Sequence, residues 1–581
     1  MATAIIFLAL LFCGAHRVLA EAFEPVKTGK VDDRPPNVVM FLLDDTGLGD
    51  LGCYGNKSVK TPNIDKISRE GMKFNRMYAN PYCSPSRAAI LTGRLPPRTG
   101  ILKGRILQWQ VFVSSASNGG LHHDELTMAE VFKENGYDTR LLGKWHIGDG
   151  PGGKYLPMTH GFDYWVGTPL THAYTCGATY GGQWTLQNLF YPFFEFFGFF
   201  VVLALGIPTL KLVGLVDMSG MFKLVKAYCV FYVLVFLYIA TMTLTNPRSC
   251  ILYRNNKIIQ QPYYTDNLTL EYTREAVDYL EERGKERSKP FFLMMSYNQM
   301  HTTVFASHTF KNTGGLGLYS DALREMDWSV GKVMAELKRH KLDDNLLVML
   351  TSDNGPLSTY EPHTQAHVPV DQGGSAGEVT NSKGERVRLK GFKSTNWEGG
   401  IRVPGIIRWP GKIPGGIEVD SVTSIMDFFP TVLDIMKRPV RDRIIDGRSL
   451  LPFIENANRP TQHNFLFHWC DPDHPAAVTY KNYKAIFVDE TIHVGCNRNF
   501  RSEPLLFDMA NDPGESKPLT LDKYQDVLEE IRVAIRFHMQ SLNQNYITEM
   551  EKIFVPWWFP CQNFPYCSVT PKPGYYAKLG I

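Results

Sequence analysis

Four short apolar runs, each followed at once by a polar cluster, constrain the fold of this chain more than any other feature. The runs are residues 37–43 (NVVMFLL), 139–142, 290–297 (PFFLMMSY) and 346–351. Continuous apolar runs of this length are typical of strands buried on both faces of a parallel sheet. Amphipathic segments such as 126–135 and 319–340 predict helices around them. This alternation predicts a doubly wound α/β domain.

The residues that follow these runs are unusually rich in charged and hydrogen-bonding side chains. In open α/β sheets, ligands bind beyond the carboxyl ends of the strands. We therefore expect four polar clusters to converge on one pocket, namely Asp44 with Asp45, Lys144 with His146, His301, and Asp353 with Asn354.

The chemistry of these clusters indicates a metal site. Carboxylate and amide oxygens are hard ligands that suit Ca²⁺ or Mg²⁺. A single Asp after a strand is as often a helix cap or turn former, but two such clusters together favour a metal. Lys393 and the cationic or proton-donating groups at 144, 146 and 301 then suggest an anionic ester bound to the metal. Taken alone, either histidine would more often be structural.

Charge and composition exclude several classes of protein. The 581 residues hold 61 Lys and Arg against 58 Asp and Glu, so the net charge is +3. A charge this small creates no long-range field for nucleic acid, and we expect no such partner. The composition is also unlike that of collagen, coiled coils or disordered chains.

The first 20 residues predict a cleaved secretory signal. An apolar run from Ala4 to Cys13 is followed by a small-residue site ending at Ala20. The run is too short to span a bilayer, and the alternative is a buried first helix. A secretory signal places the chain in an oxidising compartment.

Residues 186–245 hold two long hydrophobic segments that predict a transmembrane helical hairpin. Ala227 to Leu244 carries no charge, and eighteen helical residues cover about 27 Å, close to the hydrocarbon thickness of a bilayer. The earlier segment carries one charged residue, Glu195. The favourable insertion of nearby Phe residues offsets the free-energy cost of placing this carboxylate in the bilayer. Lys211, Lys223 and Lys226 lie between the segments and favour a cytosolic tip with lumenal flanks. The alternative is a buried helical hairpin inside a soluble domain.

Two strings give the sequence a family resemblance. Residues 83–94 read CSPSRAAILTGR, and residues 136–146 read GYDTRLLGKWH. The first resembles the sulfatase modification signature Cys-x-Pro-x-Arg followed by Leu-Thr-Gly-Arg, and the second resembles the other signature of that family. About ten positions at set spacing make chance agreement negligible. This resemblance argues against Cys83 being an inert thiol or one half of a disulfide.

The sulfatase resemblance implies a fold, a cofactor and a mechanism. The fold would be alkaline-phosphatase-like α/β, with a mixed, mostly parallel sheet sandwiched by helices. Cys83 would be oxidised in the endoplasmic reticulum, by the formylglycine-generating enzyme, to formylglycine. One hydroxyl of its hydrate attacks sulfur, and the second expels sulfate. One Ca²⁺ would be held by Asp44, Asp45, Asp353, Asn354 and the converted Cys83.

The remaining site residues have roles implied by the same resemblance. Arg87 would hold the hydrate, and His146 would contact its hydroxyl. Lys144 and Lys393 would neutralise the sulfate oxygens, and His301 would protonate the leaving oxygen.

Within the family, the chain is most similar to sulfatases of aryl and steroid sulfates. We therefore expect a sulfatase that hydrolyses small hydrophobic sulfate esters and contacts membrane lipid through residues 186–245, beside the active site. The expected location is the endoplasmic reticulum membrane with a lumenal catalytic domain; other secretory membranes, or secretion, are the alternatives. Sequons at Asn56 and Asn267 would both be lumenal.

The expected organisation is a catalytic domain interrupted by the hairpin and followed by a smaller domain. The divisions are 1–20 (signal), 21–185 and 246–460 (catalytic domain), 186–245 (hairpin) and 461–581 (C-terminal α+β domain). In the last of these, segments 464–468, 483–488 and 504–509 predict strands, and 523–544 predicts a helix.

The ten cysteines fit an oxidising compartment. Connectivity does not follow from one sequence. The pairs that we favour are Cys176 with Cys250 at the base of the hairpin, Cys470 with Cys496, and Cys561 with Cys567, which leaves Cys53 free.

Two other functions stay open. A phosphatase or phosphodiesterase of the related superfamily would need a Ser or Thr nucleophile and two transition metals, which the Cys83 string disfavours. A noncatalytic, membrane-anchored binder of sulfated ligands would result if Cys83 were never converted.

Overall fold

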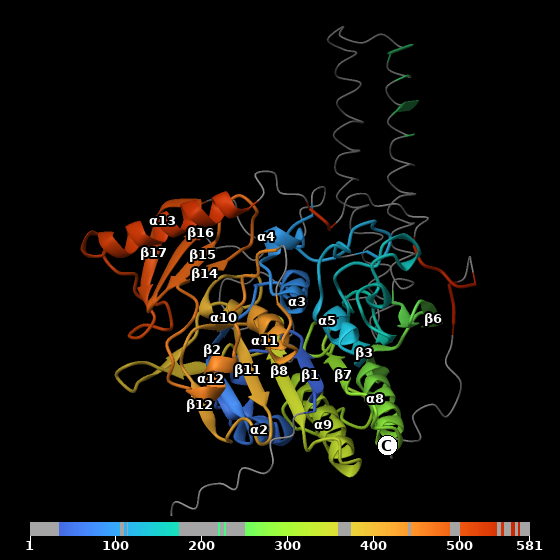
Figure 1. Ribbon diagram of the computed structural model, residues 1–581. Coiled ribbons are helices and arrows are strands. Elements are labelled where there is room, and N and C mark those ends of the chain that lie inside the picture. The colour runs from blue at the N-terminus through green and yellow to red at the C-terminus, as the bar shows by residue number, and fades with distance from the viewer. Residues whose placement is uncertain are drawn as a thin grey trace, which may run out of the picture.

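An eleven-stranded mixed sheet is the centre of the molecule in the computed structural model (Figure 1). The structure describes residues 34–104, 110–112, 114–172, 250–357, 374–439, 443–488, 500–542, 548–550, 559–563 and 567–569, with a few positions between 219 and 230. The strands of this sheet are β1 (Asn37–Leu43), β2 (Met72–Tyr78), β3 (Asp138–Gly143), β4 (Tyr164–Gly167), β5 (Leu252–Arg254), β6 (Lys257–Gln260), β7 (Phe291–Ser296), β8 (Leu346–Ser352), β11 (Arg402–Arg408), β12 (Ile417–Val419) and β13 (Thr423–Ser424).

The middle of the sheet is parallel and its sides are mixed. The order is β12-β2-β11-β8-β1-β7-β3-β4-β5-β6, and β13 also pairs with β2. Strand β1 is parallel to both neighbours, with Val38 opposite Phe292 in β7 and Leu347 in β8. Strand β11 is antiparallel to β8 and β2, and β5 is antiparallel to β4. The expected mixed, mostly parallel sheet is confirmed.

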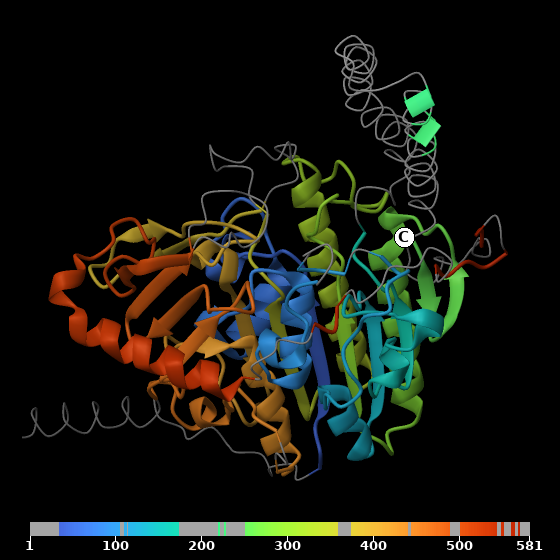
Figure 2. The ribbon, with the colours of Figure 1, turned by 90° about the horizontal axis from the view of Figure 1, so that it is seen from above.

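Helices cover both faces of this sheet, which explains why β1 is apolar at every position after Asn37 (Figure 2). Val38, Met40 and Leu42 pack into one core, and the alternate side chains of β1 pack into a second core on the other face. The first core includes residues of α3 (Cys83–Thr92), α5 (Met128–Glu134), α11 (Phe428–Ile435) and α12 (Leu451–Glu455). The second includes residues of α2 (Pro62–Arg69), α8 (Leu268–Lys285) and α9 (Leu318–Arg339). Burying each such side chain contributes about 1.5–3 kcal/mol.

A smaller C-terminal domain follows the main sheet. Its antiparallel sheet has the order β14 (Phe465–His468), β15 (Ala477–Tyr480), β16 (Tyr483–Val488) and β17 (Phe500–Asp508). Helix α13 (Gln525–Ser541) covers one face through Leu528 and Ile531. The other face packs against Trp397, beside the short helix α10 (Glu398–Ile401) of the main domain. The other short elements are α4 (Pro96–Thr99), β9 (Glu378–Thr380) and β10 (Arg386–Arg388).

A buried ionic group joins the two domains. The Nζ of Lys484, on β16, lies 3.0 Å from an oxygen of Glu398 and 2.8 Å from an oxygen of Glu515. The backbone N–H of Glu398 also donates to Glu515, at 2.7 Å. Buried charges persist only when they are paired and hydrogen-bonded, so these contacts fix how the C-terminal sheet meets α10.

Most of the predicted elements lie where the sequence places them. The apolar runs became β1, β3, β7 and β8, and the two amphipathic segments became α5 and α9. Strands β2 (MKFNRMY) and β11 (RVPGIIR) are not predicted from the sequence, because polar residues, Gly and Pro interrupt their apolar pattern. In the C-terminal domain, β17 begins four residues earlier than predicted, and β15 was not predicted.

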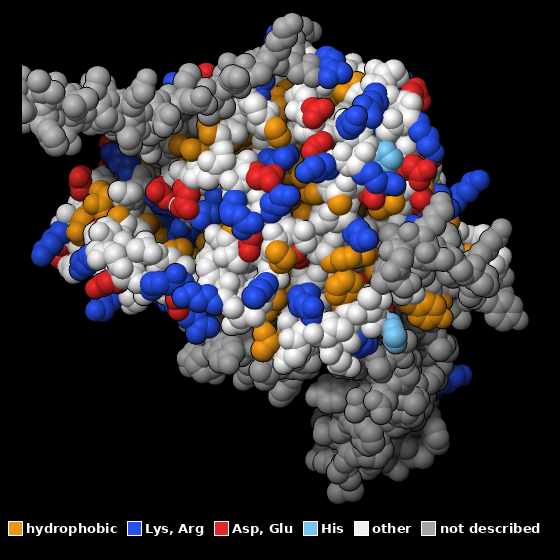
Figure 3. Space-filling view, turned by 90° about the horizontal axis from the view of Figure 1, so that it is seen from below, with side chains coloured by type: hydrophobic (Ala, Val, Ile, Leu, Met, Phe, Trp, Pro, Cys, Tyr) orange, Lys and Arg blue, Asp and Glu red, His pale blue; other side chains and the backbone are white. Residues whose placement is uncertain are grey.

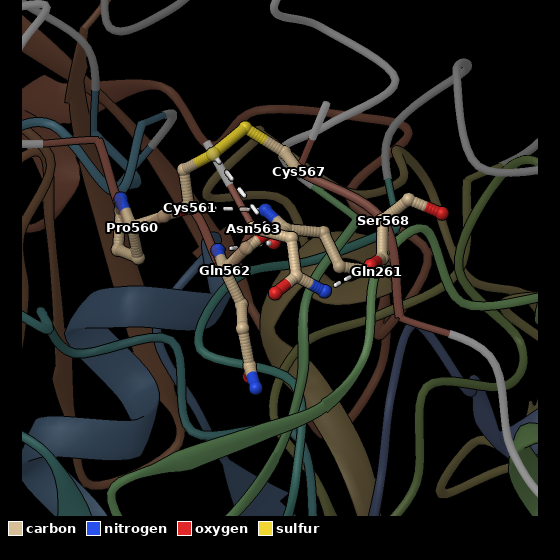
Figure 4. Close-up of a disulfide and its surroundings, with 7 residues drawn as sticks. All are labelled: Gln261, Pro560, Cys561, Gln562, Asn563, Cys567 and Ser568. Atoms are coloured by element: carbon tan, nitrogen blue, oxygen red, sulfur yellow. Dashed lines mark hydrogen bonds between the residues drawn. A yellow bond between two sulfur atoms is a disulfide. The ribbon is translucent and has the colours of Figure 1, made fainter. Parts of the chain in front are cut away.

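The C-terminal segment returns to the edge of the main sheet (Figure 4). The cysteines 561 and 567 form a disulfide with a Cα–Cα distance of 4.7 Å, as predicted. Beside it, the backbone of Gln261, just after β6, forms an antiparallel bridge with Val569. The Gln261 side chain also donates to the Pro560 carbonyl, at 2.9 Å. The disulfide therefore closes a short loop that docks on the catalytic domain.

The other cysteine predictions are tested in part. Cys250 and Cys470 are each disulfide-bonded, and their predicted partners, residues 176 and 496, lie outside the described residues. Cys53 is a free thiol, as predicted.

Among the described residues, no helix has the length and apolar character needed to cross a bilayer. The predicted hairpin at 186–245 falls outside these residues except at isolated positions, and so does the predicted signal at 1–20.

Candidate active site

The carboxyl ends of the central parallel strands bring the predicted site residues together. Asp44 and Asp45 follow β1, Asp353 follows its neighbour β8, and Lys144 follows β3. Because β8, β1, β7 and β3 are consecutive and parallel, their ends meet at one edge of the sheet. Asp45 has φ +50°, a left-handed conformation that is uncommon outside glycine and is often found at functional sites.

Three carboxylates and one thiol form a compact, buried cluster at this edge. One oxygen from each of Asp44, Asp45 and Asp353, together with Sγ of Cys83, all lie within 4.8 Å of one another. The side chains are at most 1% exposed. Burial and the neighbouring Asp44 raise the pKa of Asp353, against the opposing effect of Arg87.

Asn354 completes an oxygen-rich donor set. Its Nδ2 donates to Asp45 Oδ1 and to the Gly355 carbonyl, both at 2.8 Å. Its Oδ1 is buried and has no hydrogen-bond partner among the described residues. An acceptor in this state is costly unless a ligand satisfies it. Carboxylate oxygens beside an unpartnered amide oxygen therefore fit a hard divalent cation such as Ca²⁺ or Mg²⁺.

Each carboxylate of the cluster has a cationic partner. Lys144 Nζ lies 2.5 Å from Asp44, and Lys393 Nζ lies 2.7 Å from both oxygens of Asp45. Arg87 Nε donates to Asp353 at 2.9 Å. Three cations balance three carboxylates, so a bound divalent ion would leave a net positive site that suits an anionic ester.

Lys393 comes from a loop that contacts two other parts of the site. Its backbone N–H donates to the Pro356 carbonyl at 2.8 Å, and the next N–H donates to the Pro81 carbonyl at 3.0 Å. Burial lowers the pKa of Lys393, but Asp45 and Cys83 more than offset this, so the pKa is raised and the ammonium is charged. The loop thus holds a cation between the β8 end and the segment leading to Cys83.

Cys83 begins α3, a helix in which every residue is buried. Arg87 is one turn later on the same face, since residues four apart are neighbours on a helix. Pro85 lies in the first turn, where the missing N–H removes no intrahelical bond. The spacing Cys-x-Pro-x-Arg thus places a thiol and a guanidinium side by side.

The thiol of Cys83 is buried beside the carboxylates, and its Sγ lies 3.7 Å from Asp44 Oδ1. Burial raises the pKa of this thiol to about 12, although Lys144 and Lys393 act in the opposite direction.

The two predicted histidines lie beside this cluster as neutral rings. His146 Nε2 lies 2.8 Å from the Phe112 carbonyl and therefore carries the proton, while its buried Nδ1 has no partner among the described residues. His301 Nδ1 donates to the Thr302 carbonyl, which leaves Nε2 as an acceptor. A His301 ring nitrogen also lies within 4.8 Å of Asp45 and Cys83 atoms. Burial, followed by nearby lysines, lowers the pKa of both rings well below the ordinary value.

Sequence reasoning missed two side chains that support the site. Ser296, at the end of β7, accepts from Arg87 at 2.7 Å and donates to the Lys144 carbonyl at 2.7 Å. It lies one residue before the end of the predicted strand 290–297, and that position was an available signal. His172 Nε2 donates to the carbonyls of His301 (3.1 Å) and Thr303 (2.9 Å). Its ring meets the His301 ring edge-on, with centroids 5.4 Å apart. No local pattern marks it.

Comparison with known proteins agrees with this geometry. The sequence model of the Sulfatase family matches residues 36–438, and that of the C-terminal region of aryl-sulfatase matches residues 461–569. Steryl-sulfatase of Homo sapiens is 38% identical over 547 residues, which cover 87% of this chain and 88% of that protein. Arylsulfatase D of Homo sapiens is 32% identical, covering 97% and 95%.

A solved structure shows the same fold. The PsFucS1 sulfatase from Pseudoalteromonas sp. superposes with a TM-score of 0.65 at 24% identity, covering 88% of this chain and 92% of that one. The family model matches most of the chain, and the sequence is more than 30% identical to curated sulfatases over nearly its whole length. This chain therefore belongs to the sulfatase family and is a sulfuric ester hydrolase.

Proposed function

We propose that this chain hydrolyses sulfate monoesters of hydrophobic phenols or alcohols, using a formylglycine made from Cys83 and one bound Ca²⁺. The observation that carries this proposal is the position of Cys83. It lies at the start of a buried helix, with three carboxylates and an unpartnered amide oxygen on one side and three cations around them. A sulfate group placed there meets positive charge and a nucleophile together.

Asp44, Asp45, Asp353 and Asn354 are the residues that would hold the cation. All four offer hard oxygens, and the orphaned Asn354 Oδ1 is the strongest sign that a ligand belongs there. When bound, the ion lowers the pKa of a coordinated hydroxyl and withdraws charge from sulfate oxygens. Lys144 and Lys393 neutralise Asp44 and Asp45. We assign their ammonium groups to the sulfate oxygens.

Converted to formylglycine, Cys83 supplies an aldehyde whose hydrate offers one hydroxyl to attack sulfur and a second to expel sulfate afterwards. Arg87 is anchored by Asp353 and Ser296 and would hold this side chain in place. The buried Nδ1 of His146 is an acceptor with no partner in the described part of the chain, and we assign it to the hydroxyl of the same group. The formylglycine-generating enzyme is the partner that this conversion requires.

His301 would donate the proton that the leaving oxygen needs. Burial and the two lysines lower the pKa of the ring and keep it neutral. The negative charge of a bound sulfate ester opposes the effect of the lysines and favours the protonated ring. His172 fixes the backbone at His301 and Thr303 and so sets the position of this acid.

Hydrophobic sulfate esters are the substrate class that we favour. The human relative is named a steryl-sulfatase, and residues 186–245 of this chain are long and apolar enough to form a membrane hairpin. An apolar ester partitions into the bilayer, so a membrane-bound lumenal enzyme of the endoplasmic reticulum could take its substrate there. Within this proposal, the signal at 1–20 is removed, and residues 21–185 and 246–460 form the catalytic domain, followed by 461–581.

Replacing Cys83 with Ser should abolish turnover, because Ser offers one hydroxyl and has no second hydroxyl to expel the bound sulfate. Activity on 4-nitrophenyl sulfate should fall at least about 10³-fold, the scale of losing a catalytic nucleophile. Mass spectrometry of the peptide containing Cys83 should show an aldehyde that reacts with a hydrazine probe. Cys53→Ser is the matched control and should keep both properties. An intact thiol in fully active protein would contradict the proposal.

Asn354→Ala should weaken Ca²⁺ binding, because it removes an oxygen that has no hydrogen-bond partner among the residues that the structure describes. In the parent chain, Ca²⁺ at 100 times Kd should stabilise the fold by about 2.7 kcal/mol, seen as a rise in Tm. The variant should show little rise at the same Ca²⁺ concentration, whereas the exposed-site variant Asn511→Ala should match the parent. An equal rise in Asn354→Ala would mean that the ion binds elsewhere.

His301→Gln should slow esters with poor leaving groups most, because only they depend on a proton donor. We expect a loss of about 10²–10⁴-fold in kcat on the sulfate of a steroid alcohol and a much smaller loss on 4-nitrophenyl sulfate. His308→Gln, an exposed histidine farther along the same loop, serves as the control. Equal losses on the two esters would remove His301 from the role of acid.

Deleting residues 186–244 should reduce activity on a membrane-partitioned steroid sulfate far more than on soluble 4-nitrophenyl sulfate. The reason is that the hairpin would bring the active site to the bilayer that holds the apolar ester. Activity on 4-nitrophenyl sulfate reports whether the shortened chain is folded. If both activities fall by the same factor in folded protein, the membrane-access proposal is wrong.

A further inference from the structure

A polar pocket lies at the amino ends of the central parallel strands, whereas the active site lies at their carboxyl ends. It has a volume of about 250 Å³ and is lined by the start of β1 (Asn37), the start of β7 (Phe291) and the residue before β8 (Asn345). The connections that leave α8 and α9 complete its walls. Since these parallel strands run from this pocket to the catalytic carboxylates, the two sites are separated by the length of the sheet.

The pocket is strongly cationic. Its lining includes a single carboxylate, Asp344, and five cationic side chains: Arg34, Arg283, Arg287, Lys289 and Lys341. Figure 3 shows the molecule from below in the view of Figure 1, and Lys and Arg side chains are prominent on that face. The whole chain has a net charge of only +3. The positive charge around this pocket therefore exceeds what the nearly neutral chain would give on average.

Two of these cations have structural partners. Arg287 donates to the carbonyls of Gly284 (3.3 Å) and His340 (2.6 Å), at the carboxyl ends of α8 and α9. Cations are favourable at helix carboxyl ends, so helix capping explains Arg287. Arg283 forms an ion pair with Glu286 at 3.1 Å. Neither contact requires a ligand.

Helix capping does not explain Lys289 and Lys341. Neither has a carboxylate partner within 4.0 Å in the part of the chain that the structure describes, although Asp343 and Asp344 follow Lys341 closely in sequence. Both lysines are exposed at the mouth of the pocket and come from different connections, one before β7 and the other after α9. Two like charges beside one cavity repel each other, and an anion between them removes that cost.

The floor of the pocket is rigid. Asn37 Nδ2 donates to the Leu342 carbonyl at 3.2 Å, and its backbone N–H donates to the Asn345 carbonyl at 2.9 Å. Trp409 Nε1 donates to Asn345 Oδ1 at 3.0 Å. These bonds tie the segment that carries Lys341 to the ends of buried strands. The backbone of this wall is thus pre-organised, which lowers the cost of binding.

We propose that this pocket binds a small molecule carrying at least two phosphate or sulfate groups. Cations on separate walls match a ligand with two separated anionic groups better than a ligand with a single anionic group. A volume of about 250 Å³ is at the lower end for small-molecule sites and too small for a polymer chain. The ligand is therefore a compact multiply charged anion, bound far from the catalytic residues.

Calorimetry on the full chain tests this assignment, with Cys83→Ala in all proteins so that no sulfate ester is consumed. Inorganic diphosphate and a disulfated monosaccharide serve as separate probes of the phosphate and sulfate sources. The double variant Lys289→Glu/Lys341→Glu should weaken binding of the preferred probe at least tenfold, and added salt should weaken it further. Lys517→Glu/Lys523→Glu, exposed lysines of the C-terminal domain with the same charge change, should bind as the parent does.

The milder pair Lys289→Gln/Lys341→Gln should give an intermediate loss, and it replaces the charge reversal if that variant does not fold. With Cys83 intact, both pairs should hydrolyse 4-nitrophenyl sulfate at the parental rate, which separates this pocket from the active site. Failure of both probes to bind the parent chain, or binding that survives both pairs of substitutions, would overturn the assignment.

Discussion

Burial of three carboxylates around one thiol is the interaction on which this site depends. Asp44, Asp45 and Asp353 are almost completely excluded from water, and each buried ion costs several kcal/mol unless it is paired. The partners of these carboxylates come from α3, from the end of β3 and from the loop before α10. The charges balance only when all of these segments are assembled, so the electrostatics of the site require the complete main domain.

The cations that pair with the buried carboxylates are the groups that we assign to an anionic ester. Lys144 and Lys393 contact oxygens of Asp44 and Asp45, which the proposed mechanism also assigns to a metal. In that mechanism, metal binding would be coupled to release of the two ammonium groups toward a sulfate. Arg87, in contrast, is anchored on Asp353, Ser296 and the Lys144 carbonyl. It is positioned before any ligand arrives, which limits the reorganisation that binding requires.

The C-terminal domain contributes to the site without supplying a predicted site residue. Lys484 and Glu515 hold Glu398, which begins α10 a few residues after Lys393. The loop that carries Lys393 is thereby fixed between the main sheet and the smaller one. At the amino ends of the central strands, Lys289 and Lys341 are exposed and have no carboxylate partner within 4.0 Å among the described residues. The cations of the active site are thus paired with buried carboxylates, whereas these two lysines are exposed to solvent.

Local sequence patterns were sufficient to predict the central strands, the oxygen-bearing side chains after β1 and β8, and the pairing of Cys83 with Arg87. Each of these depends on local order: apolar runs define buried strands, and a spacing of four residues places two side chains on one helix face. Strands β2 and β11 were beyond that reasoning, since neighbouring strands and not their own pattern bury them. The packing of distant segments places Asn354 against Asp45, 309 residues away, and leaves its Oδ1 without a hydrogen-bond partner among the described residues. It also places His172 against the His301 backbone and brings cations together at the amino ends of the central strands. Such contacts join segments distant in sequence, and no local periodicity records them.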